Sequence, residues 1–172
     1  QYAANLPTTP ATTASSTAIA GTLTAAGGLN PSDFAQNPLV LGTPPTPFGD
    51  NTVTGSAALN QAATPAPITT ATALSGTAPS DSLPTSFVAG DTITVDGTVL
   101  TFVASGATGN QLNVTDTVGT LLNKIGAVTG VTPTINASTG AITLHTGTAQ
   151  NLSVSSSAPA FAALGFNTTM TA

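Results

Sequence analysis

The sequence contains no cysteine, no tryptophan, no glutamate and no arginine. Without cysteine there is no disulfide framework and no thiol chemistry. Charged residues make up 4% of the 172 residues, against roughly 25% in an ordinary soluble domain, and aromatic residues are equally scarce at 4%. These absences narrow the classes of function that the chain can perform.

The charge that is present is almost entirely negative. Lys124 is the sole cation, and the six carboxylates are Asp33, Asp50, Asp81, Asp91, Asp96 and Asp116. Nucleic-acid binding and attachment to anionic membranes both need several Lys or Arg side chains, so we expect neither partner. Nor does any uninterrupted apolar run approach the roughly 18–20 residues of a membrane-spanning helix.

Threonine, serine, alanine and glycine supply the surface instead, a composition typical of an exported bacterial surface or filament component. The large apolar side chains concentrate after about residue 84. We therefore predict two regions: residues 1–83, a Thr/Ala/Pro-rich extended arm or small β subdomain, and residues 84–172, an α+β outer domain. Such a poor supply of large apolar groups makes it hard for the first region to offset its ordering entropy, so we expect it to need a partner surface.

The first region has only short, weak signals for regular structure. Its expected elements are a linker at residues 1–17, a strand at 18–24, a helical turn after Asn30, an edge strand from residue 39, and strands at Thr52–Ser56 and Ile68–Ser75. Prolines interrupt the stretch repeatedly and exclude long strands.

From Phe87 the pattern becomes regular. Asp96-Gly97 lies between Thr92–Val95 and Thr98–Val103, which predicts a β-hairpin because both central turn residues tolerate positive φ. Thr115 or Asp116 is expected to cap a helix that ends at Gly130. The apolar stripe of this helix consists of Val118, Leu121, Leu122, Ile125 and Val128.

Three further strands and a short helix follow. We expect strands at Thr132–Asn136, Ala141–His145 and Asn151–Ser155, then a helix from Pro159 to Leu164 that Gly165 ends. The order is ββαβββ, in a mainly β, α+β fold with one helix covering antiparallel hairpins and an extended, strand-poor N-terminal half before it.

No residue pattern predicts a catalytic, cofactor-binding or metal site. His145 has no nucleophile or orienting carboxylate near it in the sequence, so we interpret it as a surface or edge histidine without a catalytic role. The aspartates invite a calcium hypothesis, but they follow no EF-hand pattern. Asp91, Asp96 and Asp116 each have a local explanation as a loop, turn and cap residue. We therefore expect no cofactor and no enzymatic activity.

The glycine-rich segments at residues 106–110 and 147–151 lack the lysine and helix of a phosphate loop. Four Asn-X-Ser/Thr patterns begin at Asn113, Asn136, Asn151 and Asn167. In a sequence so rich in Asn, Ser and Thr such patterns arise by chance, and the same composition allows O-linked glycans on Ser and Thr.

Four stretches resemble a domain that bacterial flagellins carry between their helical ends. They are Ala89–Gly97, the helix Asp116–Ile125, the strand Gly140–His145 and the closing Ala162–Phe166. Their order is also similar to a short repeat of flagellin and hook-associated proteins that has an Ile-Asn pair at the end of its helix, where this chain has Ile125-Gly126. The resemblance covers residues 81–166.

The resemblance implies an outer, solvent-facing domain of a flagellin subunit in the extracellular bacterial flagellum, with copies of itself as partners. Flagellin polymerises through long terminal helices, and no sustained heptads occur here, so we expect the variable outer region alone. The alternative is a secreted adhesin, surface-layer or tail-type module that binds glycans. Such a site needs clustered aromatic rings, and this chain has Tyr2 and six scattered phenylalanines.

Overall fold

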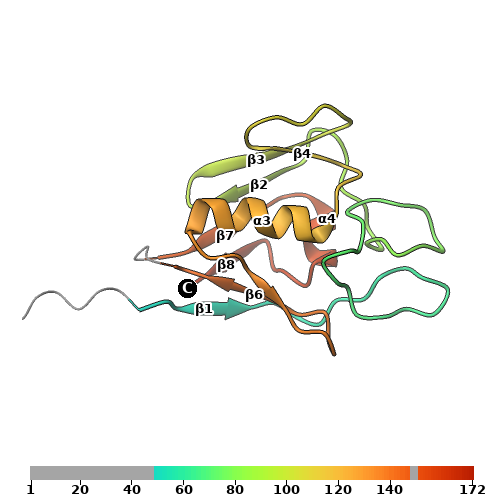
Figure 1. Cartoon of the computed structure of the whole chain (residues 1–172), viewed down its shortest axis with the longest axis horizontal. Helices are drawn as coiled ribbons and strands as arrows, with labels where there is room; N and C mark the ends of the chain where they lie inside the picture. The colour runs from blue at the N-terminus through green and yellow to red at the C-terminus, as the bar shows by residue number, and fades with distance from the viewer. Residues whose placement is uncertain (1–48, 148–150) are drawn as a thin grey trace, which may run out of the picture. The chain divides into compact units, whose positions relative to one another are not determined.

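A computed structural model describes residues 49–147 and 151–172 (Figure 1). The chain divides into Gln1–Thr46 and Pro47–Ala172, and all described residues belong to the second unit. The elements expected at residues 1–17, 18–24, after Asn30 and at 39–48 lie outside the described residues. The sequence placed a boundary between residues 83 and 84, whereas the unit of the structure begins at Pro47.

A five-stranded sheet forms the larger part of this unit. Its strand order is β4-β3-β2-β7-β8, with bounds Gln111–Asn113 (β4), Thr98–Val103 (β3), Thr92–Val95 (β2), Ser153–Ser155 (β7) and Thr169–Thr171 (β8). The predicted hairpin is confirmed: Val95 pairs with Thr98, and both turn residues have positive φ, 47° at Asp96 and 81° at Gly97. This is the geometry that two-residue hairpins with a matching twist require.

Strand β4 departs from the antiparallel pattern. It runs parallel to β3, with Phe102 opposite Leu112, and the connection between them is only residues 104–110. No strand was predicted there, because three residues give too short an alternation to recognise. The buried Leu112 is the one apolar anchor of β4.

A second, three-stranded sheet has the order β1-β6-β5, with bounds Thr52–Thr54 (β1), Ile142–His145 (β6) and Thr134–Ile135 (β5). Both neighbours are antiparallel to the central strand β6. Ile142 and Leu144 point into the core. The predicted strands at Thr132–Asn136, Ala141–His145 and Thr52–Ser56 are confirmed, each with fewer residues than predicted.

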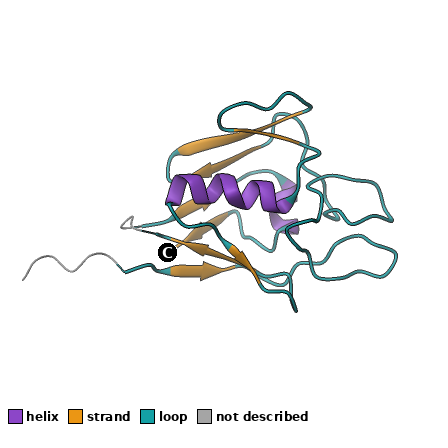
Figure 2. Cartoon of the chain, in the orientation of Figure 1, coloured by secondary structure: helices purple, strands orange, loops and turns teal. Residues whose placement is uncertain are grey.

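In the view of Figures 1 and 2, helix α3 (Val118–Thr129) lies in front of the sheets, with β3 and β4 above it and β6 and β1 below it. Its predicted stripe is confirmed: four members are buried and Val128 is partly buried. Gly130 ends it with φ 85°. The predicted cap was wrong by one residue, because Thr117 Oγ1 accepts the backbone N–H of Thr120 at 3.3 Å.

Helix α4 (Pro159–Ala163) closes the core near the C-terminus. Phe161, Leu164 and Phe166 are buried, as expected, and the rings of Phe161 and Phe166 have centroids 5.0 Å apart. A second aromatic pair, Phe87 and Phe102, stacks with centroids 4.1 Å apart. These pairs concentrate the aromatic area of the described residues in one core.

Residues 55–86 have no strand longer than a bridge but belong to the same core. Ile68, Leu74 and Leu83 are fully buried, and Ala73 forms bridges with Ser82 and Thr117. The strand predicted at Ile68–Ser75 was therefore wrong. The backbone of this segment bonds instead to partners scattered along the rest of the unit.

Within the described residues the fold is mainly β, with two sheets and two short helices. This agrees with the expected mainly β, α+β class. The observed order from β2 onward is β2-β3-β4-α3-β5-β6-β7-α4-β8. The helix contacts β2, as a helix that covers a sheet should.

Candidate functional site: the polar network between β1 and β6

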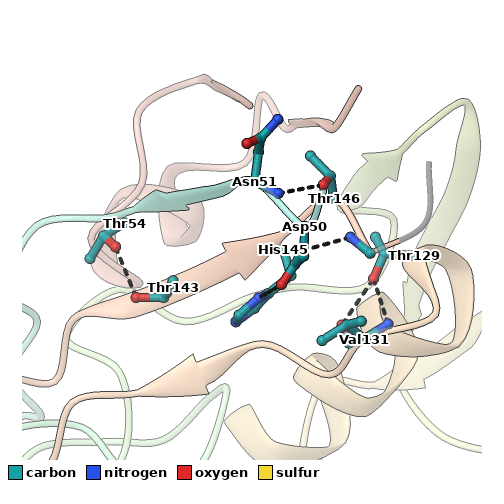
Figure 3. A network of polar contacts seen from close by, with 9 residues as sticks. Asp50, Asn51, Thr54, Thr129, Val131, Thr143, His145 and Thr146 are labelled. Atoms are coloured by element: carbon teal, nitrogen blue, oxygen red, sulfur yellow. Dashed lines mark hydrogen bonds and ion pairs between the residues drawn. The ribbon is translucent and has the colours of Figure 1, made fainter. Parts of the chain in front are cut away.

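A network of polar contacts lies where β1 meets β6, and its centre is a histidine–aspartate pair. His145 Nδ1 lies 2.7 Å from Asp50 Oδ2 (Figure 3). The other oxygen of this carboxylate accepts the backbone N–H of Gly147 at 2.9 Å. The carboxylate thus bridges the side chain at the end of β6 and the backbone that follows it.

Antiparallel pairing explains why these residues meet. Thr52 lies opposite His145 in the ladder, so the residues just before β1 reach the end of β6. Asn51 donates its backbone N–H to Thr146 Oγ1 at 2.9 Å and accepts the N–H of Thr146 at 2.9 Å. At the other end of the strand pair, the hydroxyls of Thr54 and Thr143 are 2.8 Å apart.

The electrostatics of the pair favour an ionised carboxylate. The hydrogen bond from His145 is the largest cause that lowers the pKa of Asp50 below its ordinary value of 3.8. Burial opposes this shift, and the N–H of Gly147 adds to it. The Asp50 side chain keeps 40% of its surface exposed, whereas that of His145 keeps 17%.

The sequence predicted a surface or edge position for His145, and this position was wrong. The residue lies on β6, the central strand of its sheet, and its side chain is largely buried. Asp50 was not predicted as the carboxylate that orients His145, because 95 residues separate the two side chains. The only signal in the sequence was the alternating pattern of the two strands that bring them together.

The second ring nitrogen decides what this pair can do chemically. His145 Nε2 is buried, and among the described residues no hydrogen-bond partner reaches it. A histidine that acts as a general base needs a proton to abstract within hydrogen-bond reach of this atom. Through the contact of Nδ1 with the Asp50 carboxylate, the pair fastens β1 to β6.

The other carboxylates of the described residues are also engaged within the chain. They accept hydrogen bonds at 2.7–2.9 Å as follows: Asp81 from Asn60 and Thr72, Asp91 from the backbone of Val88, Asp96 from the backbone of Ser153, and Asp116 from the backbone of Asn113. No group of three or more His, Cys, Asp or Glu residues that could hold a metal ion occurs within 49–147 and 151–172.

Asp116 was expected to cap the helix, but its carboxylate caps the turn before it. Its Oδ2 accepts the N–H of Asn113 at 2.8 Å, and Thr117 takes the position at the helix N-terminus. Asp96 does occupy the predicted hairpin turn, and it also reaches across to the start of β7. Asp116 and Asp96 thus both have structural roles in turns of the chain.

The glycine-rich segment at residues 106–110 is a loop that the chain's own side chains hold. Lys124 Nζ donates to the carbonyl of Gly109, and Asn113 Oδ1 accepts the N–H of Ala107 at 3.0 Å. The segment at residues 147–151 is described only at its two ends.

The four Asn-X-Ser/Thr patterns differ in exposure. Asn113 is half-buried and uses both its side-chain oxygen and nitrogen in hydrogen bonds. Asn136, Asn151 and Asn167 are exposed. The backbone N–H of Ser138 donates to Asn136 Oδ1 at 2.9 Å in the turn between β5 and β6.

Comparison with known proteins adds no relative. No protein-family model matches the sequence, and no curated protein or solved structure matches the chain. Among the helices of the described residues, none has the length and apolar character needed to cross a membrane.

Proposed function

We propose that this chain is a structural component of an extracellular bacterial filament, the outer domain of a flagellin subunit that makes lateral contacts with copies of itself. The observation that carries the proposal is that the charged side chains form hydrogen bonds within the chain. In the described residues, all five carboxylates and the single lysine form hydrogen bonds within the chain, and threonine and serine hydroxyls supply much of the remaining polar surface for contact.

The outward face of the five-stranded sheet illustrates this surface. Its side chains alternate with the buried ones, and none is charged: Thr92, Thr94, Val99, Thr101, Val103, Gln111, Asn113, Ser153, Ser155, Thr169 and Thr171. A face without charge can approach a second acidic copy without like-charge repulsion.

The stretches that resemble the flagellin domain become one connected set of elements. They contain the strand β2 with the turn after it, most of the helix α3, the strand β6, and the end of α4 with the residues that follow it. We take ββαβββ as the underlying order of this domain, with β4 and β8 as additions at the two edges of its sheet.

The glycan-binding alternative has less support. Sugar-binding surfaces commonly present exposed aromatic rings, but Phe87, Phe102, Phe161 and Phe166 each retain no more than 4% of their surface. These are all the aromatic rings within residues 49–147 and 151–172. Large exposed apolar side chains there are the isolated Leu59, Val88 and Val99.

Immunogold electron microscopy of the source cells tests the proposal. Antibodies raised against the 172-residue chain should label extracellular filaments along their length, and antibody pre-adsorbed with the same chain serves as the control. Label confined to the cell wall, or absent from filaments that are clearly present, would contradict the proposal.

A further inference from the structure

Strand β8 is an edge whose outward backbone groups have no partner among the described residues. Leu152 and Ala172 exchange hydrogen bonds in both directions, at 2.9 and 3.2 Å, and Ser156 donates to Thr168 at 3.1 Å. Antiparallel pairs alternate between bonded and non-bonded positions. The N–H and C=O groups of Thr169 and Thr171 therefore point away from β7.

The opposite edge of the same sheet is closed. On β4, the N–H of Gln111 donates to Thr108 O at 2.9 Å, and the N–H of Asn113 donates to Asp116 Oδ2 at 2.8 Å. These turns and side chains occupy the donors that a further strand would need. The contrast matters because an unpaired edge strand is a template for another chain unless something covers or blocks it.

The β8 edge also lacks the usual blocking features. Residues 168–172 contain no charged side chain and no proline, and both Thr169 and Thr171 are exposed. Strand β1 has a comparable edge at Thr52 and Thr54, but it begins beside the exposed carboxylate of Asp50. A second acidic copy would meet that charged side chain at β1 and would meet no charged side chain on β8.

We propose that β8 is the contact strand between two copies of this chain, pairing antiparallel with β8 of the second copy about Met170. Thr169 of one copy then lies opposite Thr171 of the other, and the two residues exchange backbone hydrogen bonds. Met170 stays in its own core because its side chain points inward. The inference rests on the proposed function, since it names the surface that makes the lateral contact.

Such a contact is weak on its own. A three-residue edge buries far less than the roughly 1,000 Å² that a stable interface needs. Two copies held in one assembly experience an effective concentration of about millimolar, which is where a weak contact becomes populated. The chain should therefore be monomeric when dilute and should pair through β8 when concentrated.

Disulfide trapping in the cysteine-free chain tests the register. The variants Thr169→Cys and Thr171→Cys are mixed at about millimolar concentration under mild oxidation, the range in which the contact should form. One variant is isotopically labelled so that intact mass identifies heterodimers. Residues opposite each other in a bonded pair have Cα atoms about 5.5 Å apart, within disulfide range, whereas Thr169 and its own copy are too far apart.

The matched control is the pair Thr52→Cys and Thr54→Cys, which has the same residue type, spacing and exposed position on β1. We expect a several-fold excess of heterodimer from the β8 mixture over the β1 mixture and over either β8 variant alone. Equal yields from the two mixtures would overturn the inference. As a second readout that needs no substitution, amide hydrogen exchange at Thr169 and Thr171 should slow several-fold as the chain is concentrated, and unchanged exchange would also overturn it.

The two proposals fail separately. Labelled filaments together with no β8 crosslink would leave the filament proposal standing and reject β8 as the contact. A β8 crosslink in solution together with unlabelled filaments would support the contact and reject the filament proposal.

Discussion

Residues 49–86 and residues 87–172 share one core but reach it by different means. The second region uses hairpins and a capped helix, whereas the first uses one short strand, β1, together with isolated bridges and side-chain hydrogen bonds. Burial is the same in both: Leu74 and Ile68 retain 0% of their surface, as does Phe102. A segment can therefore contribute fully buried side chains to the core although its sequence lacks the periodicity that predicts a strand or a helix.

The irregular region is held because its backbone groups find partners in the regular one. Leu74 donates to Asp116 O at 2.8 Å, and Val118 donates to Thr72 O at 2.8 Å. Ser56 donates to Gly165 O at 2.7 Å. Because these bonds cross between the two regions, the unit should unfold in a single transition.

Replacing a buried leucine in the irregular region should have the largest effect. We expect Leu74→Ala to lower the free energy of unfolding by about 2–5 kcal/mol, as for other buried leucines, with the loss appearing in the one urea transition of the whole unit. Leu59→Ala is the matched control, because Leu59 lies in the same region but is 48% exposed, and it should change stability by less than about 0.5 kcal/mol.

The same experiment shows whether the two regions unfold together or separately. If residues 49–86 were an arm that folds apart from the rest, Leu74→Ala would leave the main transition, followed by the near-ultraviolet signal of the buried Phe rings, at its original midpoint.

The close approach of the two regions at Gly165 gives the next largest effect. Gly165 has φ 83°, and a Cβ there would collide with the carbonyl oxygen of Ser56. Gly165→Ala should cost the roughly 1–2 kcal/mol of a left-handed alanine and, in addition, the cost of separating the two segments.

The variant Gly106→Ala separates the conformational cost of a left-handed alanine from the cost of moving the two segments apart. Gly106 has φ 74°, but a Cβ there meets nothing within 4 Å, so only the conformational cost applies. Urea denaturation of both variants measures the difference. Equal losses would mean that the contact at Ser56 contributes nothing to joining the two regions.

Sequence periodicity predicted the regular region well and the irregular region poorly, for a physical reason. The hairpin at Asp96-Gly97 and the stripe of α3 follow from local rules about turns and helical spacing. Residues 55–86 obey no local rule, because their positions depend on contacts with partners that are distant in sequence, such as Asp116 and Gly165. The strand expected at Ile68–Ser75 failed because its apolar residues point into the core from an irregular backbone.

The N-cap of α3 shows the limit of local rules on a finer scale. Thr115, Asp116 and Thr117 are all good cap residues by type. The structure selects Thr117 because Asp116 is already engaged with Asn113. Thr117→Ala should therefore lower the free energy of unfolding by about 1 kcal/mol, whereas Thr115→Ala, at an exposed position, should stay within about 0.5 kcal/mol. Thermal unfolding of both variants measures this difference. A larger loss of stability from Thr115→Ala than from Thr117→Ala would mean that Thr115, one of the two residues expected from the sequence, caps the helix.

The pair that joins the two regions at β1 and β6 should give the smallest effect, and it is visible only through pH. The pKa of Asp50 is lowered in the folded chain, first by the hydrogen bond from His145. A carboxyl with a lowered folded pKa contributes stability above its unfolded pKa and loses it as pH falls through the folded pKa. The contribution of Asp50 should therefore be complete well above pH 3.8, its ordinary value, and should disappear as the pH drops below it.

Urea denaturation of the wild-type chain, Asp50→Asn and His145→Gln from neutral to acidic pH measures this contribution. Asp50→Asn should remove part of the acid-range loss, because the carboxyl that must take up the proton is gone. His145→Gln should reduce the same loss, because it removes the main cause of the lowered pKa while leaving the carboxyl in place. Identical acid profiles for all three chains would mean that the 2.7 Å contact does not fasten β1 to β6, and the hydroxyl and backbone bonds of Asn51, Thr54 and Thr146 would then hold the strand alone.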